Sequence, residues 1–598
     1  MYARRKGEKM NEDLEKIREA KKAWEEGPLA KTIKKFPYCT PESSRFYSPL
    51  DVEDFDFLEK VGFPGTYPFT AGTFAVEPLA GLARFAHMAG SGEGTGQIPG
   101  AGPTRAAIYS GYGTPEDTRD YYKGLLERGG RGGPNLAFDL PTQCGYDSDD
   151  PLVEGEVGKV GVCVDSLADF EIIYEPYQGD LNLDRIASNF TINAPANVII
   201  AMYAALAEKR GVPLEKLRAT PQNDILKEYV ARGTYIFPPK PALRMFRDSL
   251  LFICKNMPNV NITSIGGYHI REAGATREQD LAFSMAIAIA YLQVGVDAGL
   301  HVDEFAPRFT FNAFGGSMEI LKEIAFQRAA RRMYARILKE RFGAKDDRSM
   351  RIRQVLGAHI GPSSTTLQRP LNNLTRAVLG AVASVMSGGR PLPFPPYDEP
   401  LGLGWSLEAM QLATDAGRII TCEAKLLEYT DPFAGSYCME AMTDEIENAA
   451  WEELEKIEKM GGAVAAIENG YMQREVSRSA YERQRAMETC QRLVVGVNCF
   501  TGEDELEVTT NRLVPNPYDP VKREQAEERQ RERLAEIKKS RDNKEVARLL
   551  NELKDLAAKE EENLIPHLIE CVKAYATEGE ICNVLREVFG EFQAVSPF

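Results

Sequence analysis

Histidine is scarce in this chain, and one of its five copies follows a short apolar segment. The stretch SIGGYHIREAGATREQD (264–280) places His269 after two glycines and ahead of a helix start. Thr276 and Gln279 fit the capping-box pattern, in which each side chain accepts a hydrogen bond from the other residue's backbone N–H, and they mark that start. An imidazole in such a loop can donate a hydrogen bond or move a proton, although a loop histidine by itself more often has a structural role.

Two further side chains could bind a charged or polar group of a substrate. Arg232, in VARGTYI, ends a helix-like segment, where a cation by itself most simply interacts with the last carbonyls of the helix. Its planar guanidinium could equally hold a carboxylate through two hydrogen bonds. Tyr109, in IYSGYGT, combines an aromatic body with a polar tip, although ordinary core packing explains such a tyrosine as well.

The elements that must position these residues alternate between strands and helices. From about residue 65 to residue 404, short apolar runs are followed by amphipathic segments, with turn-forming residues between them. This alternation predicts an α/β fold with a parallel sheet, most economically a (β/α)8 TIM barrel, with a doubly wound sheet as the structural alternative. In a barrel, the loop that holds His269 lies at the carboxyl ends of the strands, where active sites occur. The predicted strands are 135–140, 186–192, 217–219, 259–265 and 308–312, and the predicted helices include 196–210 and 279–298.

The two ends of the chain differ from the barrel domain, 65–404. Residues 1–64 are typical of a charged helix followed by an extended arm, which usually wraps a partner or its own domain. Residues 405–598 are mostly helical; the highly charged part, 519–562, predicts a solvated pair of surface helices, and the final segment regains an apolar face that should dock on a core or a partner. The glycine-rich stretch 90–102 lacks the context of a phosphate loop, and we interpret it as a flexible loop that could act as a lid.

Composition excludes several classes of protein. Among 598 residues, 43% are hydrophobic and 27% charged, as in soluble globular proteins, and the net charge of −16 argues against nucleic acid or an anionic membrane as a partner. No stretch is long and apolar enough for a membrane span, and the charged N-terminus is not a secretory signal. The ten cysteines form no C-x-x-C pair, so we expect a reduced, cytoplasmic protein without a disulfide framework or a metal site of its own.

Seven longer motifs together resemble one family. They occur in the order seen in the large subunit of methylmalonyl-CoA mutase, and the resemblance runs from about Lys35 to the C-terminus. It implies a (β/α)8 barrel threaded by the pantetheine arm of an acyl-CoA, with adenosylcobalamin at the carboxyl ends of the strands. The cofactor supplies an adenosyl radical that abstracts a substrate hydrogen, after which the thioester group migrates to the neighbouring carbon. The motifs are GTYPFTAG, IYSGYGTPEDT, LAFDLPTQCGYDSD, TPQNDILKEYVARGTYIFPP, SIGGYHIREAGAT, VDEFAPRFTF and DPFAGS.

The resemblance assigns catalytic roles to three residues. His269 matches the histidine that hydrogen-bonds the thioester carbonyl and stabilises charge on that oxygen. Arg232 matches the arginine that holds the free carboxylate of a malonyl-type substrate, and Tyr109 matches a tyrosine that contacts the same carboxylate at the boundary with the cofactor. Mutases that act on monocarboxylic, isobutyryl-type thioesters replace both residues, so their presence favours a dicarboxylic acyl-CoA.

Further polar residues match ligand contacts of the family. Polar groups that line a narrow barrel would be costly to bury without a ligand as partner. Asn135 and Asn189 stand where the family has serine, and Glu272 alone would be interpreted as a solvated loop charge. Positions that match CoA or substrate-amide contacts are Asn135, Asn189, Thr191, Thr220, Gln222 and Arg308, and positions that match acidic residues facing the cobalamin or its adenosyl group are Glu272 and Glu399.

One stretch departs from the family. Methylmalonyl-CoA mutases carry a stretch close to RPWTIRQYAG before the tyrosine, whereas this chain has GPTRAAIYSG, with Ala106, Ala107 and Ile108 at the altered positions. Two family arginines are therefore missing, and Arg105 and Arg84 are the candidates to replace them. Smaller side chains beside the carboxylate site imply room for a bulky, benzyl-type or aminobenzyl-type substituent, whose burial contributes on the order of a few kcal/mol.

The signature of the cobalamin-binding domain, D-x-H-x-x-G, is also missing. The only H-x-x-G here starts at His87, with Phe85 in place of the aspartate. We therefore expect no flavodoxin-like cobalamin domain in this chain, and a separate small subunit that carries the cobalt-ligating histidine, in a heterotetramer of two large and two small subunits.

Other functions remain as alternatives. Methylmalonyl-CoA and ethylmalonyl-CoA mutase large subunits belong to the same class. A non-catalytic subunit that binds acyl-CoA belongs to another, and the joint presence of Tyr109, Arg232 and His269 argues against it. A zinc or disulfide enzyme on the same barrel is excluded, because this sequence lacks cysteines and histidines at ligand spacing.

Overall fold

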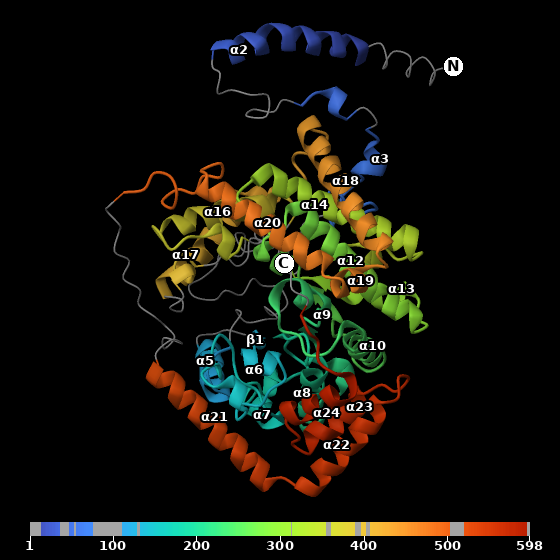
Figure 1. Cartoon of the computed structure of the whole chain (residues 1–598), viewed down its shortest axis with the longest axis vertical. Coiled ribbons are helices and arrows are strands. Elements are labelled where there is room, and N and C mark those ends of the chain that lie inside the picture. The colour runs from blue at the N-terminus through green and yellow to red at the C-terminus, as the bar shows by residue number, and fades with distance from the viewer. Residues whose placement is uncertain are drawn as a thin grey trace.

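The structure, a computed structural model, describes residues 14–35, 47–52, 55–75, 111–127, 132–312, 314–353, 360–388, 396–401, 407–502 and 520–594. Within these ranges helices predominate and the strands are short (Figure 1). The strands are β1 (Asn135–Ala137), β2 (Ser188–Thr191), β3 (Ala219–Pro221), β4 (Thr263–Ile265) and β5 (Phe309–Phe311).

The described strands are parallel and neighbour one another in chain order. β1, β2 and β3 form one sheet, and β4 and β5 form another. Backbone hydrogen bonds join the two sheets, because Asn261 N donates to Ala219 O at 2.9 Å and Ser264 N donates to Gln222 O at 2.8 Å. This order agrees with the α/β fold predicted from the sequence, but these five strands do not show a closed (β/α)8 barrel.

Helices follow the strands as predicted. Helix α8 (Ala196–Lys209) ends one residue earlier than predicted, and α12 (Arg277–Asp297) begins two residues earlier than the predicted 279–298. The capping box is confirmed, since Gln279 N donates to Thr276 Oγ1 at 3.2 Å and Thr276 N donates to Gln279 Oε1 at 2.9 Å. The other helices of this region include α5 (Pro115–Glu127), α6 (Leu140–Gln143), α7 (Leu167–Ile173), α10 (Pro239–Asn256), α11 (Gly267–Ala273), α13 (Val302–Phe305), α14 (Ile320–Arg336), α16 (Asn372–Met386) and α17 (Leu407–Arg418).

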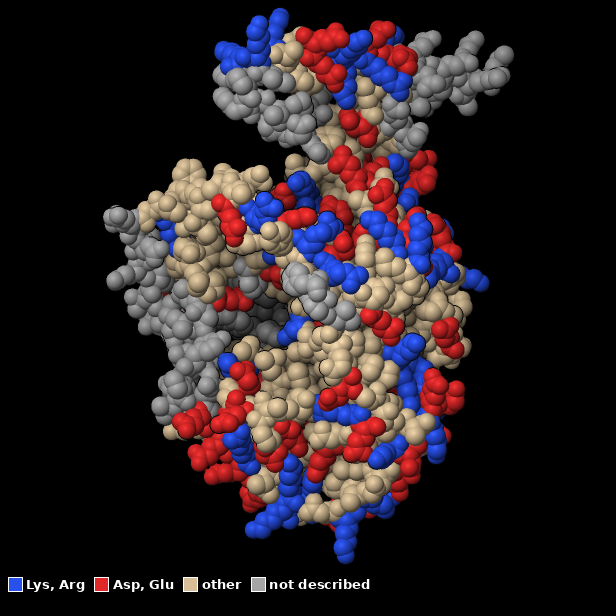
Figure 2. Space-filling model, in the orientation of Figure 1, with Lys and Arg blue, Asp and Glu red and all other residues tan. Residues whose placement is uncertain are grey.

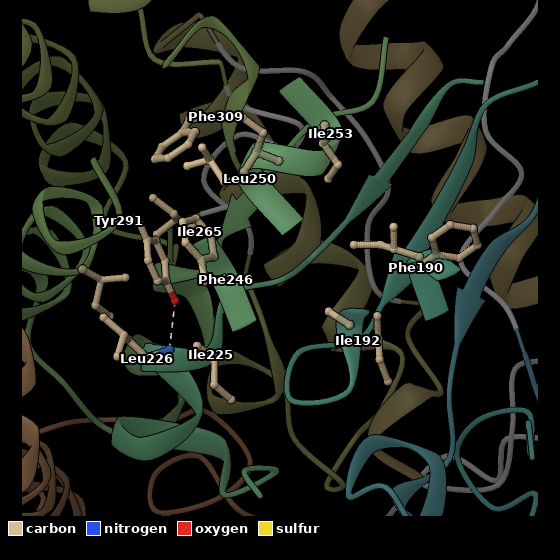
Figure 3. Packing of buried hydrophobic residues seen from close by; sticks show 14 of the residues in the cluster. Phe190, Ile192, Ile225, Leu226, Phe246, Leu250, Ile253, Ile265, Tyr291 and Phe309 are labelled. Carbon is tan, nitrogen blue, oxygen red and sulfur yellow. Dashed lines mark hydrogen bonds between the residues drawn. The ribbon is translucent and has the colours of Figure 1, made fainter. Parts of the chain in front are cut away.

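The core lies between the strands and the helices that cover them. Figure 3 shows Ile265 of β4 among side chains of α10 and α12. Phe246 of α10 stacks on Tyr291 of α12 with ring centroids 4.2 Å apart, and the Tyr291 hydroxyl accepts a hydrogen bond of 2.9 Å from Leu226 N. This contact fixes the backbone after β3, the segment that leads to Arg232.

Helix α12 is the one described helix long and apolar enough to cross a membrane. This composition differs from the sequence-based expectation that no stretch would qualify. However, 78% of the apolar window is buried inside the protein, which is typical of the core helix of a soluble fold.

The N-terminal helical residues 14–35 stand clear of the rest of the protein (Figure 1). They include η1 (Glu25–Leu29), a wide turn that contains Pro28, and α2 (Ala30–Lys35). The predicted extended arm falls largely on residues 36–46, which lie outside the described residues.

The C-terminal helices pack on two different parts of the molecule. Helix α18 (Tyr437–Lys459) packs against α12 and α14, whereas α23 (Ile565–Lys573) packs against α8. The final segment therefore docks on the core, as predicted. The predicted solvated pair is only partly exposed, because α21 (Pro520–Ser540) forms ion pairs with the body through Arg533 and Lys538. The remaining helices of this region are α19 (Ala463–Glu468), α20 (Tyr471–Glu488), α22 (Asn543–Ala557) and α24 (Glu578–Phe589).

Candidate functional site

A row of polar residues crosses the first strands. Asn135 of β1 is paired with Asn189 of β2, which is paired with Thr220 of β3. Asn261, just before β4, extends the row by donating from Nδ2 to Thr220 Oγ1 at 2.7 Å. All four are half-buried, whereas the next residue of each strand, such as Leu136 or Phe190, is buried. Because successive strand residues face opposite sides, this polar row faces away from the apolar core.

Thr191 and Arg308, also predicted to contact the ligand, are not part of this polar row. Thr191 is one layer along β2 from Asn189, on the same face, and is half-buried. Arg308 does not join the polar row. Its guanidinium donates to Cys254 Sγ at 2.8 Å and to Glu304 O at 3.1 Å, so it lies against the end of α10.

Gln222, directly after β3, belongs to a buried network. It is only 5% exposed, and its Oε1 accepts hydrogen bonds from Asn193 Nδ2 at 2.9 Å and from Lys227 Nζ at 2.8 Å. Lys227 also pairs with Glu228 at 2.6 Å, and both side chains are fully buried. Burial lowers the pKa of Lys227 below its ordinary value, although the neighbouring carboxylate of Glu228 opposes this. The network fixes the orientation of the Gln222 amide.

Arg232 is the last residue of a wide turn, η7 (Glu228–Arg232). The turn ends at Gly233, whose φ of +85° suits glycine and whose N–H donates to Glu228 O at 2.8 Å. The Glu228 carboxylate accepts hydrogen bonds from Thr234 N and Thr234 Oγ1, which fixes the chain beyond the turn. The Arg232 side chain is exposed, and these hydrogen bonds hold the backbone on either side of it.

Gln143 of α6 contacts Arg232. Its Nε2 donates to Phe138 O at 2.5 Å, and its Oε1 accepts a hydrogen bond of 3.3 Å from Arg232 Nη2. The amide therefore has one defined orientation with its oxygen toward the guanidinium. Sequence reasoning missed Gln143, because it lies 89 residues from Arg232 and no local pattern marks it.

His269 lies in the first turn of α11, not in an open loop as predicted. Its N–H donates to Gly266 O at 3.2 Å, and the residue is half-buried. A Cβ atom at Gly266 would lie 2.9 Å from His269 Nδ1 and 3.6 Å from Asp224 Oδ2, so glycine leaves room for the imidazole here. Gly266 N donates to Asp224 Oδ2 at 2.7 Å, which ties the β4 end to the segment that leads to Arg232.

Helix α11 is held in place by a buried ion-pair cluster. Arg271 Nη2 donates to Glu323 Oε1 at 3.1 Å, and Arg277 Nη2 donates to the same oxygen at 2.6 Å. A Cβ atom at Gly315 would lie 2.1 Å from Arg271 Cβ, so only glycine permits this close approach. The cluster fixes the helix that carries both His269 and Glu272.

Of the two acids assigned to the cofactor side, Glu272 influences the pKa of Glu399. Glu272 accepts hydrogen bonds from Ser363 N at 2.8 Å and Ser363 Oγ at 3.0 Å, and burial raises its pKa. Burial, followed by the charges of Asp398 and Glu272, raises the pKa of Glu399 to about 7. Glu399 therefore carries a proton in a large fraction of molecules at neutral pH, and can donate as well as accept a hydrogen bond.

The described structure thus places most of the predicted residues in two groups. The polar row holds Asn135, Asn189 and Thr220, and the segments after β3 and β4 hold Gln222, Arg232, His269 and Glu272. Figure 2 shows that the protein face is hollowed near its middle. In the part of the chain that the structure describes, no three histidine, cysteine or acidic residues gather as metal ligands. Tyr109, the altered positions Ala106, Ala107 and Ile108, Arg84, Arg105 and the stretch 90–102 lie outside the described residues.

Comparison with known proteins adds an independent finding. A family model described as methylmalonyl-CoA mutase matches residues 103–591. The 2-hydroxyisobutanoyl-CoA mutase large subunit of Aquincola tertiaricarbonis is 37% identical over 592 residues, which cover 97% of this chain and 98% of that protein. Methylmalonyl-CoA mutase of Rhizobium meliloti is 36% identical over 82% of this chain and 67% of its own length. The mitochondrial enzyme of Homo sapiens is 36% identical over 81% of this chain, which spans 62% of that enzyme.

Proposed function

This chain belongs to the methylmalonyl-CoA mutase family as the large subunit of an acyl-CoA mutase, an isomerase, and from that premise we propose its substrate. It rearranges the carbon skeleton of a 2-substituted malonyl-CoA, with a bulky benzyl-type substituent, to the corresponding substituted succinyl-CoA. The thioester group migrates between neighbouring carbons while the free carboxylate stays in place.

The exposed guanidinium of Arg232, which Gln143 contacts, is the observation that carries the malonyl-type, dicarboxylic part of this proposal. A fixed, planar cation suits a carboxylate, which accepts two parallel hydrogen bonds from it. His269 lies after the neighbouring strand, where its imidazole would donate to the thioester oxygen and stabilise charge that develops during migration. Tyr109 would contact the same carboxylate as Arg232.

The named relative with 2-hydroxyisobutanoyl-CoA as substrate supplies a second candidate. That acyl group has a hydroxyl but no second carboxylate, so Arg232 would have no anionic partner in it. The arginine therefore favours a dicarboxylic acyl group. Methylmalonyl-CoA and ethylmalonyl-CoA meet this requirement, but the small side chains at Ala106 and Ala107 favour a larger substituent.

The polar row would contact the pantetheine amides of CoA. Asparagine and threonine side chains offer both donors and acceptors, as an amide chain requires. Thr191, on the same face of β2, and Gln222, whose amide is held by the buried network after β3, are proposed to contact the substrate as well. Arg308 is proposed to contact the CoA outside the polar row, near the amino ends of the strands.

Adenosylcobalamin would bind at the carboxyl ends of the strands, and it supplies an adenosyl radical when bound. The acids Glu272 and Glu399 fit the hydroxyl groups of its ribose, because one is held as an acceptor and the other, with a pKa near 7, can also donate. We further propose that a separate small subunit carries the cobalt-ligating histidine, that two large and two small subunits assemble, and that the enzyme is cytoplasmic.

A substrate panel tests the proposal. Purified chain is mixed with a cobalamin-binding small subunit and adenosylcobalamin, and kcat/KM is compared for methylmalonyl-, ethylmalonyl-, benzylmalonyl- and 2-hydroxyisobutanoyl-CoA. We expect the benzyl compound to give the highest value. Preference for 2-hydroxyisobutanoyl-CoA would overturn the carboxylate assignment. Binding of all four without turnover, and without an organic-radical signal in electron paramagnetic resonance, would indicate a non-catalytic partner.

A further inference from the structure

The C-terminal end of the chain contacts the segment that carries Arg232. The Phe592 ring lies edge-on against Tyr229 and Tyr235, with centroid separations of 4.8 and 4.9 Å. These two tyrosines flank Arg232 in the sequence and stack on each other at 5.3 Å. Phe592 N also donates to Ile236 O at 3.0 Å, which adds a backbone contact beyond the wide turn.

The same C-terminal segment contacts the chain next to Gln143. Arg586 of α24 donates to Cys144 O at 2.7 Å and to Gly145 O at 3.0 Å. Its guanidinium also lies over the Tyr146 ring, 4.2 Å from the centroid. Arg586 therefore fixes the turn that follows Gln143, as Phe592 fixes the turn that holds Arg232.

These contacts restrict the orientation of the Arg232 guanidinium. Without them, this exposed side chain would sample many rotamers. A single hydrogen bond to Gln143 orients it only if α6 and η7 keep their distance from each other. Arg586 contacts the turn that follows α6 and Phe592 contacts η7, so the segment that joins these two residues can hold that distance. A binding site whose charged group is oriented in advance loses less conformational entropy when the ligand binds.

We propose that residues 586–592, here called the C-terminal clamp, and Gln143 are positioning elements that orient Arg232 toward the carboxylate of the acyl group. The inference rests on the proposed function, since it takes Arg232 as the group that binds this carboxylate. It assigns to the C-terminus a part in substrate selection in addition to its packing on the core. Neither Gln143 nor Phe592 needs to touch the substrate for this role.

Affinities for malonyl-CoA and acetyl-CoA separate this role from a general loss of packing. The two thioesters share the CoA moiety and differ in the free carboxylate, so their affinity ratio reports on the groups that bind this carboxylate, Arg232 and Tyr109, of which the variants below disturb only the surroundings of Arg232. Calorimetry with the full-length chain measures both for wild type, Phe592→Ala, Phe592→Tyr, Gln143→Ala and Leu454→Ala. The last variant truncates a buried side chain of α18, away from the clamp, and controls for reduced stability.

We expect wild type to bind malonyl-CoA more tightly, and Phe592→Ala and Gln143→Ala to reduce this preference about ten-fold, as when a hydrogen bond to a charged group is lost. Affinity for acetyl-CoA should stay constant, and Phe592→Tyr and Leu454→Ala should keep the wild-type preference. If wild type has no preference, the carboxylate site itself is wrong. If wild type has one that both alanine variants retain, or that Leu454→Ala loses equally, the positioning role is wrong while the proposed function stands.

Discussion

Arg271 donates a 3.1 Å hydrogen bond to Glu323 and thereby joins α11, the short helix of His269, to the long helix α14. Both side chains are buried, and Glu323 is also bonded to Arg277. A catalytic hydrogen-bond donor must keep its position to within a fraction of an ångström, and this pair supplies that rigidity from the far side of the helix.

Arg271→Met should lower both stability and turnover. Removing Arg271 leaves the buried negative charge of Glu323 with one cationic partner fewer, which lowers the unfolding free energy by about 3 kcal/mol. Because His269 would lose its fixed position, kcat should fall more than KM rises. Chemical denaturation and steady-state kinetics measure the two effects. Arg341→Met, which breaks a largely exposed pair with Glu458, is the control and should cost less than about 1 kcal/mol.

Arg232→Ala should raise KM and also lower kcat, because the carboxylate loses both its partner and its orientation. We expect kcat/KM to fall by about 100-fold or more, as orientation contributes in addition to binding. Arg232→Lys keeps the charge without the planar fork and should restore only part of the activity. Kinetics indistinguishable from wild type for the alanine variant would remove the assignment.

Glu399 should make stability depend on pH near neutrality. Its pKa rises from 4.5 to about 7 on folding, so the protonated form is favoured in the folded state. Its stabilising contribution is complete below pH 4.5 and is lost as the pH rises through 7, with a total on the order of 3 kcal/mol. Glu399→Gln should flatten the dependence of unfolding free energy on pH between 5 and 8. Glu408→Gln, at an exposed carboxyl of α17, should leave the slope unchanged.

Enlarging the side chain at residue 107 should discriminate between substrates. Ala107→Arg restores the residue type of methylmalonyl-CoA mutases at this position, so it should lower kcat/KM for benzylmalonyl-CoA at least ten-fold more than for methylmalonyl-CoA. Ala107→Ser, which adds little volume, serves as the control. An equal loss for both thioesters would contradict the enlarged pocket.

The sequence by itself determined the family and the order of strands and helices, and it supplied the prediction of the main site residues. Local rules suffice for these features. Thr276 and Gln279 are three residues apart, and their capping box forms within a single turn. The motifs around His269 and Arg232 are continuous, so they could be recognised without knowledge of which elements lie side by side.

Only the tertiary structure decided which residues surround this site. Gln143 meets Arg232, Arg271 meets Glu323 and Phe592 meets Tyr229 across long stretches of chain. It also placed Arg308 against α10 and gave Glu399 its raised pKa, which depends on burial and on neighbouring carboxylates. Hydrogen bonds, ring contacts and desolvation depend on distances between packed elements, and the spacing of residues along the chain does not contain those distances.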